Sequence, residues 1–326
     1  MRRAPPDMQT IHVVAAVLTD GQNRVLIAQR PAGKSMAGYW EFPGGKLEAG
    51  ETSLVGLKRE LHEELGVTVR NARPLIRLSH AYPEVRVQLD VWRVIHYNGD
   101  LHACEDQPLA WVKPRELSRW NLLPADGPII TAIQFPPLML VTPSPAAHRE
   151  QFLQTLEHVL KHGVDFVQLR APELSLPDYA SLASPAIAIC HRQGVRIVLN
   201  TEPKVARDLG ADGVHLSNAR LSRLTERPMP EDFLVGASCH DETGIRLASA
   251  HGLDYLILGP VQATPSHPHG AILGWDGFKR LALNSTLPVY AIGGMLPEYL
   301  EQVRDLGGHG IAAMRGLWEA QGSASS

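Results

Sequence analysis

Eight short apolar segments recur through the second part of the chain, and they constrain its fold more than any other feature. In chain order they are LMLVTP, FVQLR, RIVLN, GVHLS, LVGASC, YLILGP, PVYAIG and GIAAM. Each is followed by an interval long enough for a helix, and strands that alternate with helices form parallel sheets. Eight such repeats predict a sheet that closes on itself, so residues 138–320 are expected to form a compact (β/α)8 barrel, the TIM barrel architecture.

The first part of the chain has a different rhythm, in which strands surround one clear helix. Strands are expected at 11–18, 24–29, 73–80, 85–96 and 109–112, and the helix at about 52–65. The proline-rich segment QFPPLMLVTPSP at 134–145 marks the change. We therefore predict an α/β protein with domains at 1–134 and 138–320, a linker at 135–137 and a disordered tail at 321–326.

Composition and charge exclude several classes of partner. The 326 residues carry a formal net charge of −3, which provides no basic field for a nucleic-acid polymer. No apolar run resembles a signal peptide or a membrane span, so no membrane partner is expected. The three cysteines, Cys104, Cys190 and Cys239, are widely spaced, which fits a reducing compartment. We expect a cytoplasmic protein, and any nucleotide it handles should be free and metal-bound.

The helix expected from Ser53 carries leucines on one face and carboxylates on the next. Its core face consists of Leu54, Leu57, Leu61 and Leu65. Its acidic face consists of Glu60, Glu63 and Glu64. Like charges three and four residues apart repel each other, so this face is either a solvated surface or the site of a cation. Hard divalent cations such as Mg²⁺ take oxygen ligands, and phosphate groups complete their coordination shell.

A longer pattern favours the cation. The spacing G-x5-E-x7-R-E-U-x-E-E-x-G-U, in which U is aliphatic, is matched by Gly45, Glu51, Arg59, Glu60, Leu61, Glu63, Glu64, Gly66 and Val67. This is the Nudix box, and residues 10–130 resemble the MutT-type Nudix hydrolases, which remove pyrophosphate from oxidised purine nucleoside triphosphates. The resemblance implies an α/β/α sandwich with a mixed sheet.

The resemblance also assigns catalytic and metal-binding roles. It implies that Mg²⁺, with Mn²⁺ as a substitute, is held by Gly44, Glu60, Glu63, Glu64 and Glu105. Glu60 would act as the general base or orient it, and Arg59 would pair with Glu51. Glu105 comes from the segment ACEDQPLAW, where Asp100 and Asp106 are alternatives.

The substrate-binding residues implied by the resemblance surround the glycine loop. They are Arg30, Ser35, Phe42, Pro43, Gly44, Gly45, Lys46 and Asp126. Lys46 would face a phosphate, although it also fits an ordinary surface lysine. Asp126 stands where the bacterial prototype has an asparagine that reads the purine edge, and Ser35 where it has a histidine. Asp126 also fits an N-cap of the following segment PIITAI, and it could serve both roles.

The second part resembles thiamine phosphate synthase and its TenI-type relatives, on the motifs VQLRAPE, LGADGVHLS, LILGPVQATPSHP and VYAIGGM. The implied ligand site consists of Arg170, Asn200, Ser238, His240, Thr264, Gly293 and Gly294. Pro172 and His267 replace lysines of the synthase, and Thr201 and Ala219 replace acidic residues. We therefore expect a degenerate module that binds a phosphorylated thiazole-like ligand. His240 matches an acid/base of the tautomerases, or it is structural.

Two functions follow from these resemblances. The first is a Mg²⁺-dependent 8-oxo-dGTP diphosphatase, which would sanitise the nucleotide pool in support of DNA replication and repair. The second is a thiamine-pathway enzyme, whose first domain cleaves a thiamine-type pyrophosphate and whose barrel binds or isomerises a thiazole phosphate. For the barrel alone, a ligand-sensing or stabilising module is a third reading.

Overall fold

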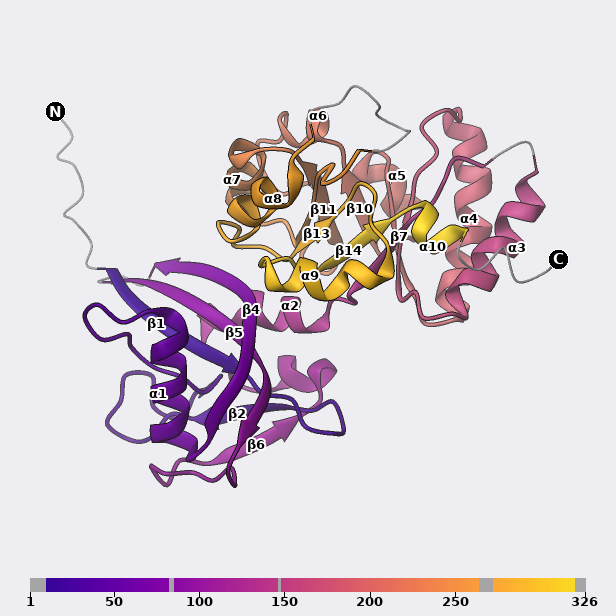
Figure 1. Ribbon diagram of the computed structural model, residues 1–326. Coiled ribbons are helices and arrows are strands. Elements are labelled where there is room, and N and C mark those ends of the chain that lie inside the picture. Colours follow the sequence, from indigo (N-terminus) through magenta and orange to yellow (C-terminus); the bar gives the residue numbers. More distant parts are fainter. Residues whose placement is uncertain (1–9, 82–84, 146–147, 264–271, 320–326) are drawn as a thin grey trace, which may run out of the picture. The chain divides into compact units, whose positions relative to one another are not determined.

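The computed structural model describes residues 10–81, 85–145, 148–263 and 272–319. Two compact units divide the chain between Phe135 and Pro136 (Figure 1). None of the helices in the described ranges combines the length and the hydrophobicity that a membrane span needs.

The first unit contains two three-stranded sheets. One has the order β1-β5-β4 and is built from β1 (Thr10–Val17), β4 (Thr68–Ala81) and β5 (Arg86–Asn98). The other has the order β3-β2-β6 and is built from β2 (Val25–Gln29), β3 (Trp40–Glu41) and β6 (Leu109–Val112). Because β5 runs parallel to β1 and antiparallel to β4, the predicted mixed sheet is confirmed.

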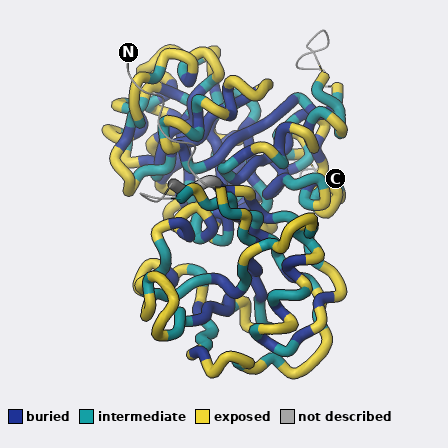
Figure 2. The backbone as a smooth tube through the Cα atoms, turned by 90° about the vertical axis from the view of Figure 1, so that its left-hand side faces the viewer, coloured by how far each residue is buried: buried dark blue, intermediate teal, exposed yellow. Residues whose placement is uncertain are grey.

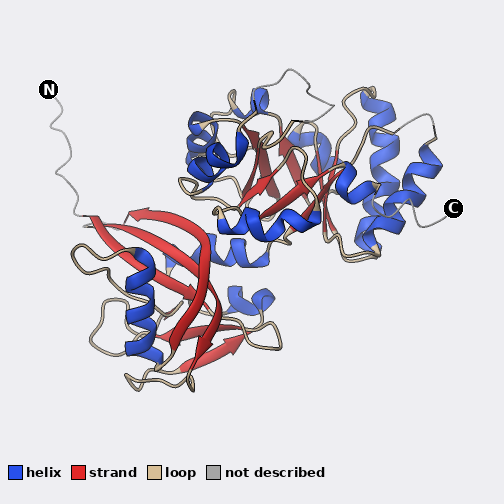
Figure 3. Ribbon diagram, in the orientation of Figure 1, coloured by secondary structure: helices blue, strands red, loops and turns tan. Residues whose placement is uncertain are grey.

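Helices cover both faces of these strands (Figure 3). The helical elements are α1 (Ser53–Leu65), η1 (Pro114–Arg119), η2 (Pro124–Asp126) and α2 (Gly127–Gln134). Val14 and Ala16 of β1 share one core with Leu57, Leu61 and Leu65 of α1. The intervening Ala15 and Val17 share a second core with Ile129 and Ala132 of α2. Since successive strand residues point to opposite faces, β1 is the middle layer of an α/β/α sandwich.

The predicted helix at 52–65 is confirmed by α1. Three of its four leucines are completely buried, and Gly66 ends it in the left-handed region at φ +68°. The predicted strand at 73–80 begins earlier, at Thr68 of β4. Register shifts between Val69 and Ile76 break the two-residue alternation there, which is why this part did not read as a strand.

The second unit is a closed barrel of eight parallel strands, so the prediction of a (β/α)8 fold is confirmed. The strands are β7 (Leu138–Val141), β8 (Phe166–Leu169), β9 (Arg196–Leu199), β10 (Gly213–Leu216), β11 (Leu234–Cys239), β12 (Tyr255–Leu258), β13 (Val289–Ala291) and β14 (Gly310–Ala313). The helical elements between and after them are α3 (Arg149–Leu160), α4 (Leu176–Arg192), α5 (Pro203–Asp208), α6 (Asn218–Leu221), α7 (Glu242–Ala250), α8 (Gly274–Ala282), η3 (Pro297–Tyr299), α9 (Leu300–Asp305) and α10 (Arg315–Trp318).

Alternate strand residues of the barrel have different environments. On β8, Val167 and Leu169 lie in the large core under the helices, so Gln168 and Arg170 face the barrel interior. Phe166, Tyr255 and Tyr290 are fully buried and in mutual ring contact, and they fill the interior. Figure 2 shows that buried residues lie mainly inside each unit and exposed residues mainly on its outside. The barrel interior is therefore filled mainly by aromatic rings, with Gln168 and His215 as buried polar groups.

Candidate active site

The glycine loop of the first unit lies between β1 and α1. The amide of Val14 donates to the Gly45 carbonyl at 2.9 Å, and the amide of Ala16 donates to the Pro43 carbonyl at 2.8 Å. Gly44 has φ +148°, and a β-carbon there would lie 2.1 Å from the Val14 carbonyl oxygen. Only glycine fits at this position, because the backbone of the loop touches the backbone of the strand.

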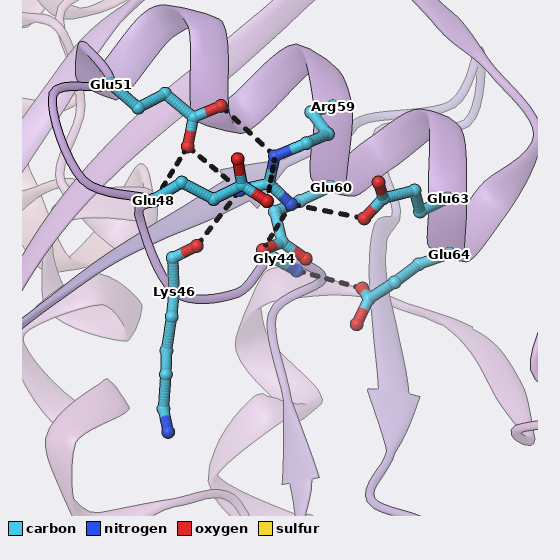
Figure 4. Close-up of polar contacts among 8 residues, drawn as sticks. All are labelled: Gly44, Lys46, Glu48, Glu51, Arg59, Glu60, Glu63 and Glu64. Atoms are coloured by element: carbon cyan, nitrogen blue, oxygen red, sulfur yellow. Dashed lines mark hydrogen bonds and ion pairs between the residues drawn. The ribbon is translucent and has the colours of Figure 1, made fainter.

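Arg59 connects this loop to the acidic face of α1 (Figure 4). Its guanidinium donates twice to Glu51, at 2.9 and 3.1 Å, and also to the Lys46 carbonyl at 3.0 Å. Its Nη1 donates to Glu60 at 3.0 Å and to Glu63 at 3.1 Å. The hydrogen bonds to Glu51 are the main cause of a raised pKa at Arg59, which stays charged. Arg59 therefore fixes the positions of three carboxylates at once.

On the acidic face of α1, the carboxylates of Glu60 and Glu64 are largely shielded from water. The Glu64 side chain accepts a 3.1 Å hydrogen bond from the Gly44 amide, yet burial raises its pKa to about 7. Burial also raises the pKa of Glu60, and the negative charge of Glu63 adds to the effect. Neighbouring carboxylates that resist ionisation in this way are stabilised by a cation.

This donor set fits a hard divalent cation, since it offers carboxylate oxygens and the carbonyl of Gly44. Within the described ranges, no three side chains of His, Cys, Asp or Glu already stand close enough together to hold a metal ion. Glu63 is 56% exposed, so its carboxylate can exchange the hydrogen bond from Arg59 for a bound ion. These residues would provide the ligands, and a bound ion would bring them together.

Glu105 reaches the site through a loop docked on the end of α1. The Cys104 amide donates to the Glu64 carbonyl at 2.9 Å, and the Gln107 side chain donates to the same oxygen at 3.0 Å. The Glu105 carboxylate accepts from Lys34 Nζ at 3.0 Å. Gln107 and Lys34 were missed by the sequence reasoning. A glutamine that is 95% buried gives no motif signal, and Lys34 lies 71 residues from its partner.

The residues predicted to contact the base are linked to one another through Arg30 and Phe42. Arg30 donates to the Ser35 carbonyl at 2.8 Å and pairs with Glu41. Phe42 is buried in the core beside α2. In Figure 4 the Lys46 ammonium points away from the carboxylates.

Asp126 is the most unusual of these residues. It is 3% exposed, and within the described part of the chain its Oδ2 has no hydrogen-bond partner. Its side chain makes no cap hydrogen bond to α2, so the predicted N-cap interaction is absent. Burial, reinforced by the charge of Glu41, raises the pKa of Asp126 well above its usual value, although the Phe42 amide opposes this. Burial therefore favours the protonated form of the Asp126 carboxyl over the ionised form.

The predicted barrel residues in the described part of the chain lie at or just after the carboxyl ends of β8, β9, β11 and β13. His215, which is fully buried, contacts Ser238 Oγ at 2.9 Å and Tyr255 Oη at 3.0 Å, and burial lowers its pKa to about 3. Gln168 is also buried, and its side-chain oxygen has no partner among the described residues. His215 and Gln168 are thus buried polar groups below the mouth of the barrel.

At the mouth itself, His240 donates through Nδ1 to the Gly259 carbonyl at 2.5 Å, which leaves Nε2 of the neutral ring as an acceptor. Gly293 and Gly294 follow β13 with φ of +100° and +69°. A β-carbon on Gly293 would lie 2.8 Å from the Pro260 α-carbon, so this turn requires glycine. Thr264 lies outside the described residues.

The metal expected for a synthase does not fit this mouth. Thr201 and Ala219 stand where the resemblance expects carboxylates, and neither can ligate as an anion. The guanidinium of Arg220 instead reaches Asn200 Oδ1 at 3.5 Å and pairs with Glu202 at 2.9 Å. At the two positions where the resemblance expects metal carboxylates, the described mouth thus has no anionic side chain, and the carboxylate of Glu202 is paired with Arg220.

Known proteins match the two units separately. The family model described as NUDIX domain matches residues 14–132, and that described as thiamine monophosphate synthase matches residues 138–317. A CTP pyrophosphohydrolase of Escherichia coli is 38% identical over 125 residues, which cover 38% of this chain and 92% of that protein. A thiamine-phosphate synthase of Thermus thermophilus is 36% identical over 185 residues, which cover 56% of this chain and 88% of that protein. A solved MutT structure, from Aliivibrio salmonicida or Vibrio cholerae, is 32% identical and covers 39% of this chain and 100% of its own, with a TM-score of 0.35.

Proposed function

Because this chain belongs to the Nudix family through residues 14–132 and to the thiamine monophosphate synthase family through residues 138–317, we propose that its first unit is a Mg²⁺-dependent nucleoside triphosphate pyrophosphohydrolase. The products are the nucleoside monophosphate and pyrophosphate. The preferred substrate is an oxidised purine nucleotide such as 8-oxo-dGTP, and the role of the enzyme is to cleanse the cytoplasmic nucleotide pool.

The observation that carries this proposal is the Arg59-centred set of carboxylates. A bound Mg²⁺ (or Mn²⁺) would neutralise the charge of the triphosphate. Its ligands would be Gly44, Glu60, Glu63, Glu64 and Glu105. Glu60 is the general base, because Arg59 fixes its carboxylate and burial raises its pKa, so that it accepts a proton from the attacking water more readily. Lys46 and Gly45 are the further proposed phosphate contacts, and the Lys46 side chain would have to turn toward the triphosphate, because its ammonium points away from the carboxylates.

The buried carboxyl of Asp126, whose protonated form burial favours, supports the choice of base. Such a group donates one hydrogen bond and accepts another side by side. The Hoogsteen edge of 8-oxoguanine presents the O6 acceptor beside an N7–H donor, whereas guanine presents two acceptors there. Asp126 therefore favours the oxidised base on that edge. Cytosine also presents an acceptor beside a donor, at N3 and N4, which agrees with the substrate named for the Escherichia coli relative.

The presence of a barrel of the thiamine monophosphate synthase family in the same chain favours one alternative. In it, the first unit cleaves a thiamine-type pyrophosphate and the barrel binds or isomerises a thiazole phosphate, with His240 Nε2 as the base. Since Thr201 and Ala219 remove the metal carboxylates, we propose that the barrel is a ligand-binding module and not a synthase. Arg170, Asn200, Ser238 and the two glycines after β13 are its proposed phosphate and ring contacts.

One assay separates these functions. With Mg²⁺, we would measure release of phosphate and pyrophosphate from 8-oxo-dGTP, dGTP, CTP and thiamine pyrophosphate. We expect the highest kcat/KM for 8-oxo-dGTP, and a preference for thiamine pyrophosphate would overturn the proposal. Glu60→Gln should lower kcat about 10²-fold or more, with an unchanged thermal melt because the leucine face of α1 is intact. Near-normal turnover of this variant would show that Glu60 is not the base.

A further inference from the structure

The loop between β2 and β3, residues 31–38, is fastened at its base and again at its tip. At the base, the Gln29 side chain donates to the Gly38 carbonyl at 3.0 Å, and Arg30 donates to the Ser35 carbonyl at 2.8 Å. At the tip, Lys34 Nζ donates to Glu105 Oε2 at 3.0 Å. The bond at the tip joins the loop to the segment that carries a proposed metal ligand.

Lys34 also lies within the field of the other acidic groups. Partial burial lowers the pKa of Lys34, but the hydrogen bond and charge of Glu105 outweigh this and raise it. The charges of Glu64 and Glu41 act in the same direction. Both side chains of the Lys34–Glu105 pair remain 46% exposed, so solvent and ligands reach them. The ammonium is therefore bonded to Glu105 and lies within electrostatic reach of Glu64 and Glu41.

The two segments that this pair joins share a backbone feature. Met36 follows Lys34 by two residues and has φ +57°, and Asp106 follows Glu105 and has φ +56°. Residues with a side chain rarely adopt this left-handed conformation, and where they do, the surrounding structure holds them in it. Both segments are thus held in shapes that place Lys34 and Glu105 opposite each other.

A lysine ammonium and a divalent cation compete for the same carboxylate, because their positive charges repel each other. We propose that Lys34 holds Glu105 in the metal-free enzyme and moves to a phosphate oxygen of the nucleotide when a divalent cation takes that carboxylate, so that it is a further substrate-positioning residue. The inference rests on the proposed function of the first unit. The flexible stem and compact ammonium of lysine suit such an exchange between two oxygen anions.

The proposal predicts opposite effects of one substitution. In Lys34→Gln, Glu105 is released, so Mn²⁺ should bind the nucleotide-free protein about two- to fivefold more tightly, the range expected for an exposed ion pair. The same variant loses a charged contact to the phosphates, so its KM for the nucleotide should rise roughly tenfold. A lysine with a merely structural role would move neither quantity in this way.

The experiment uses the full-length chain. Binding of Mn²⁺ without nucleotide is measured by electron paramagnetic resonance, and KM is measured on the best substrate of the panel above. Lys58→Gln is the matched control, because Lys58 is exposed on α1 beside Arg59 and its loss removes the same charge. Lys34→Arg keeps a cation and should stay near wild type in both measurements.

The outcomes are distinct. If Lys34→Gln binds Mn²⁺ no more tightly than Lys58→Gln, or if its KM equals that of the wild type, the proposal is overturned. Tighter Mn²⁺ binding together with a raised KM supports it. If the wild type hydrolyses no nucleoside triphosphate, the proposed function fails instead, and the Mn²⁺ titration still reports separately on the Lys34–Glu105 pair.

Discussion

The contact between Gly45 and Glu60 provides the sharpest test of the catalytic geometry. A β-carbon built on Gly45 would lie 2.3 Å from the Glu60 carboxylate carbon and 2.3 and 2.4 Å from its two oxygens. Ordinary contact begins at 3.4 Å, so Gly45→Ala must push the carboxylate away by about 1 Å. Gly45 has no left-handed φ, so the substitution acts through this contact and not through backbone strain.

A displacement of about 1 Å at a catalytic group lowers turnover by roughly 10²-fold, because the reacting atoms no longer meet in the right geometry. The 3.0 Å hydrogen bond from Arg59 to Glu60 would lengthen as well. Stability should change little, by about 1 kcal/mol, since the atoms that must move belong to the end of a flexible side chain. We therefore expect a loss of kcat with nearly unchanged folding.

The assay compares Gly45→Ala with Gly21→Ala. Gly21 lies in the turn before β2, and no heavy atom lies within 4 Å of a β-carbon built there. Steady-state pyrophosphate release should show kcat lowered about 10²-fold for Gly45→Ala and unchanged for Gly21→Ala, with both thermal melts near wild type. A Gly45→Ala enzyme within twofold of wild-type kcat would refute the placement of Glu60 against this loop.

Two further substitutions test the buried carboxyl of Asp126 and the guanidinium of Arg59. For Asp126, a folded-state pKa above its unfolded value of 3.8 means that the wild type loses stability as the pH rises from about 4 toward the folded pKa. Asp126→Asn should therefore raise the Tm of the first unit at pH 7.5 by roughly 4 °C for each kcal/mol recovered. At pH 4 the substitution should give no gain in Tm. An equal shift at both pH values would contradict a raised pKa of the buried carboxyl. Arg59→Lys should lower kcat at least about tenfold, since an ammonium cannot reproduce the double hydrogen bond to Glu51 while also reaching Glu60; wild-type kcat in this variant would mean that the fork geometry is dispensable.

The fold was predictable where hydrophobic periodicity is strong. Leu57, Leu61 and Leu65 mark the buried face of α1, and Gly66 marks its end, so sequence and structure agree on this helix. All eight barrel strands were predicted because each is a short apolar run. The irregular first half of β4 was not predicted, and neither was β3, because two residues carry no alternation.

The candidate site was only partly predictable, because the box reports positions along one loop and one helix. The Arg59 contacts to Glu51, Glu60 and Glu63 lie within that segment. Lys34 meets Glu105 only through the tertiary fold, and the raised pKa of Asp126 depends on burial that no local pattern reveals. The spacing of residues along the chain therefore identifies the carboxylates and the arginine of a Nudix site. Their pKa values depend on the tertiary fold, which the spacing does not reveal.

In the barrel, the residues that make the fold are separate from those that decide its chemistry. Val167, Leu169 and Cys239 lie in the core under the helices, and substitutions in the mouth leave that core intact. Pro172 and Ala219, which replace functional residues of the synthases, are both exposed and contribute nothing to it. Loss of the metal carboxylates is thus compatible with full retention of the barrel. Membership in the synthase family consequently fixes the architecture of this unit, whereas its ligand must be deduced from the polar groups that remain at the mouth.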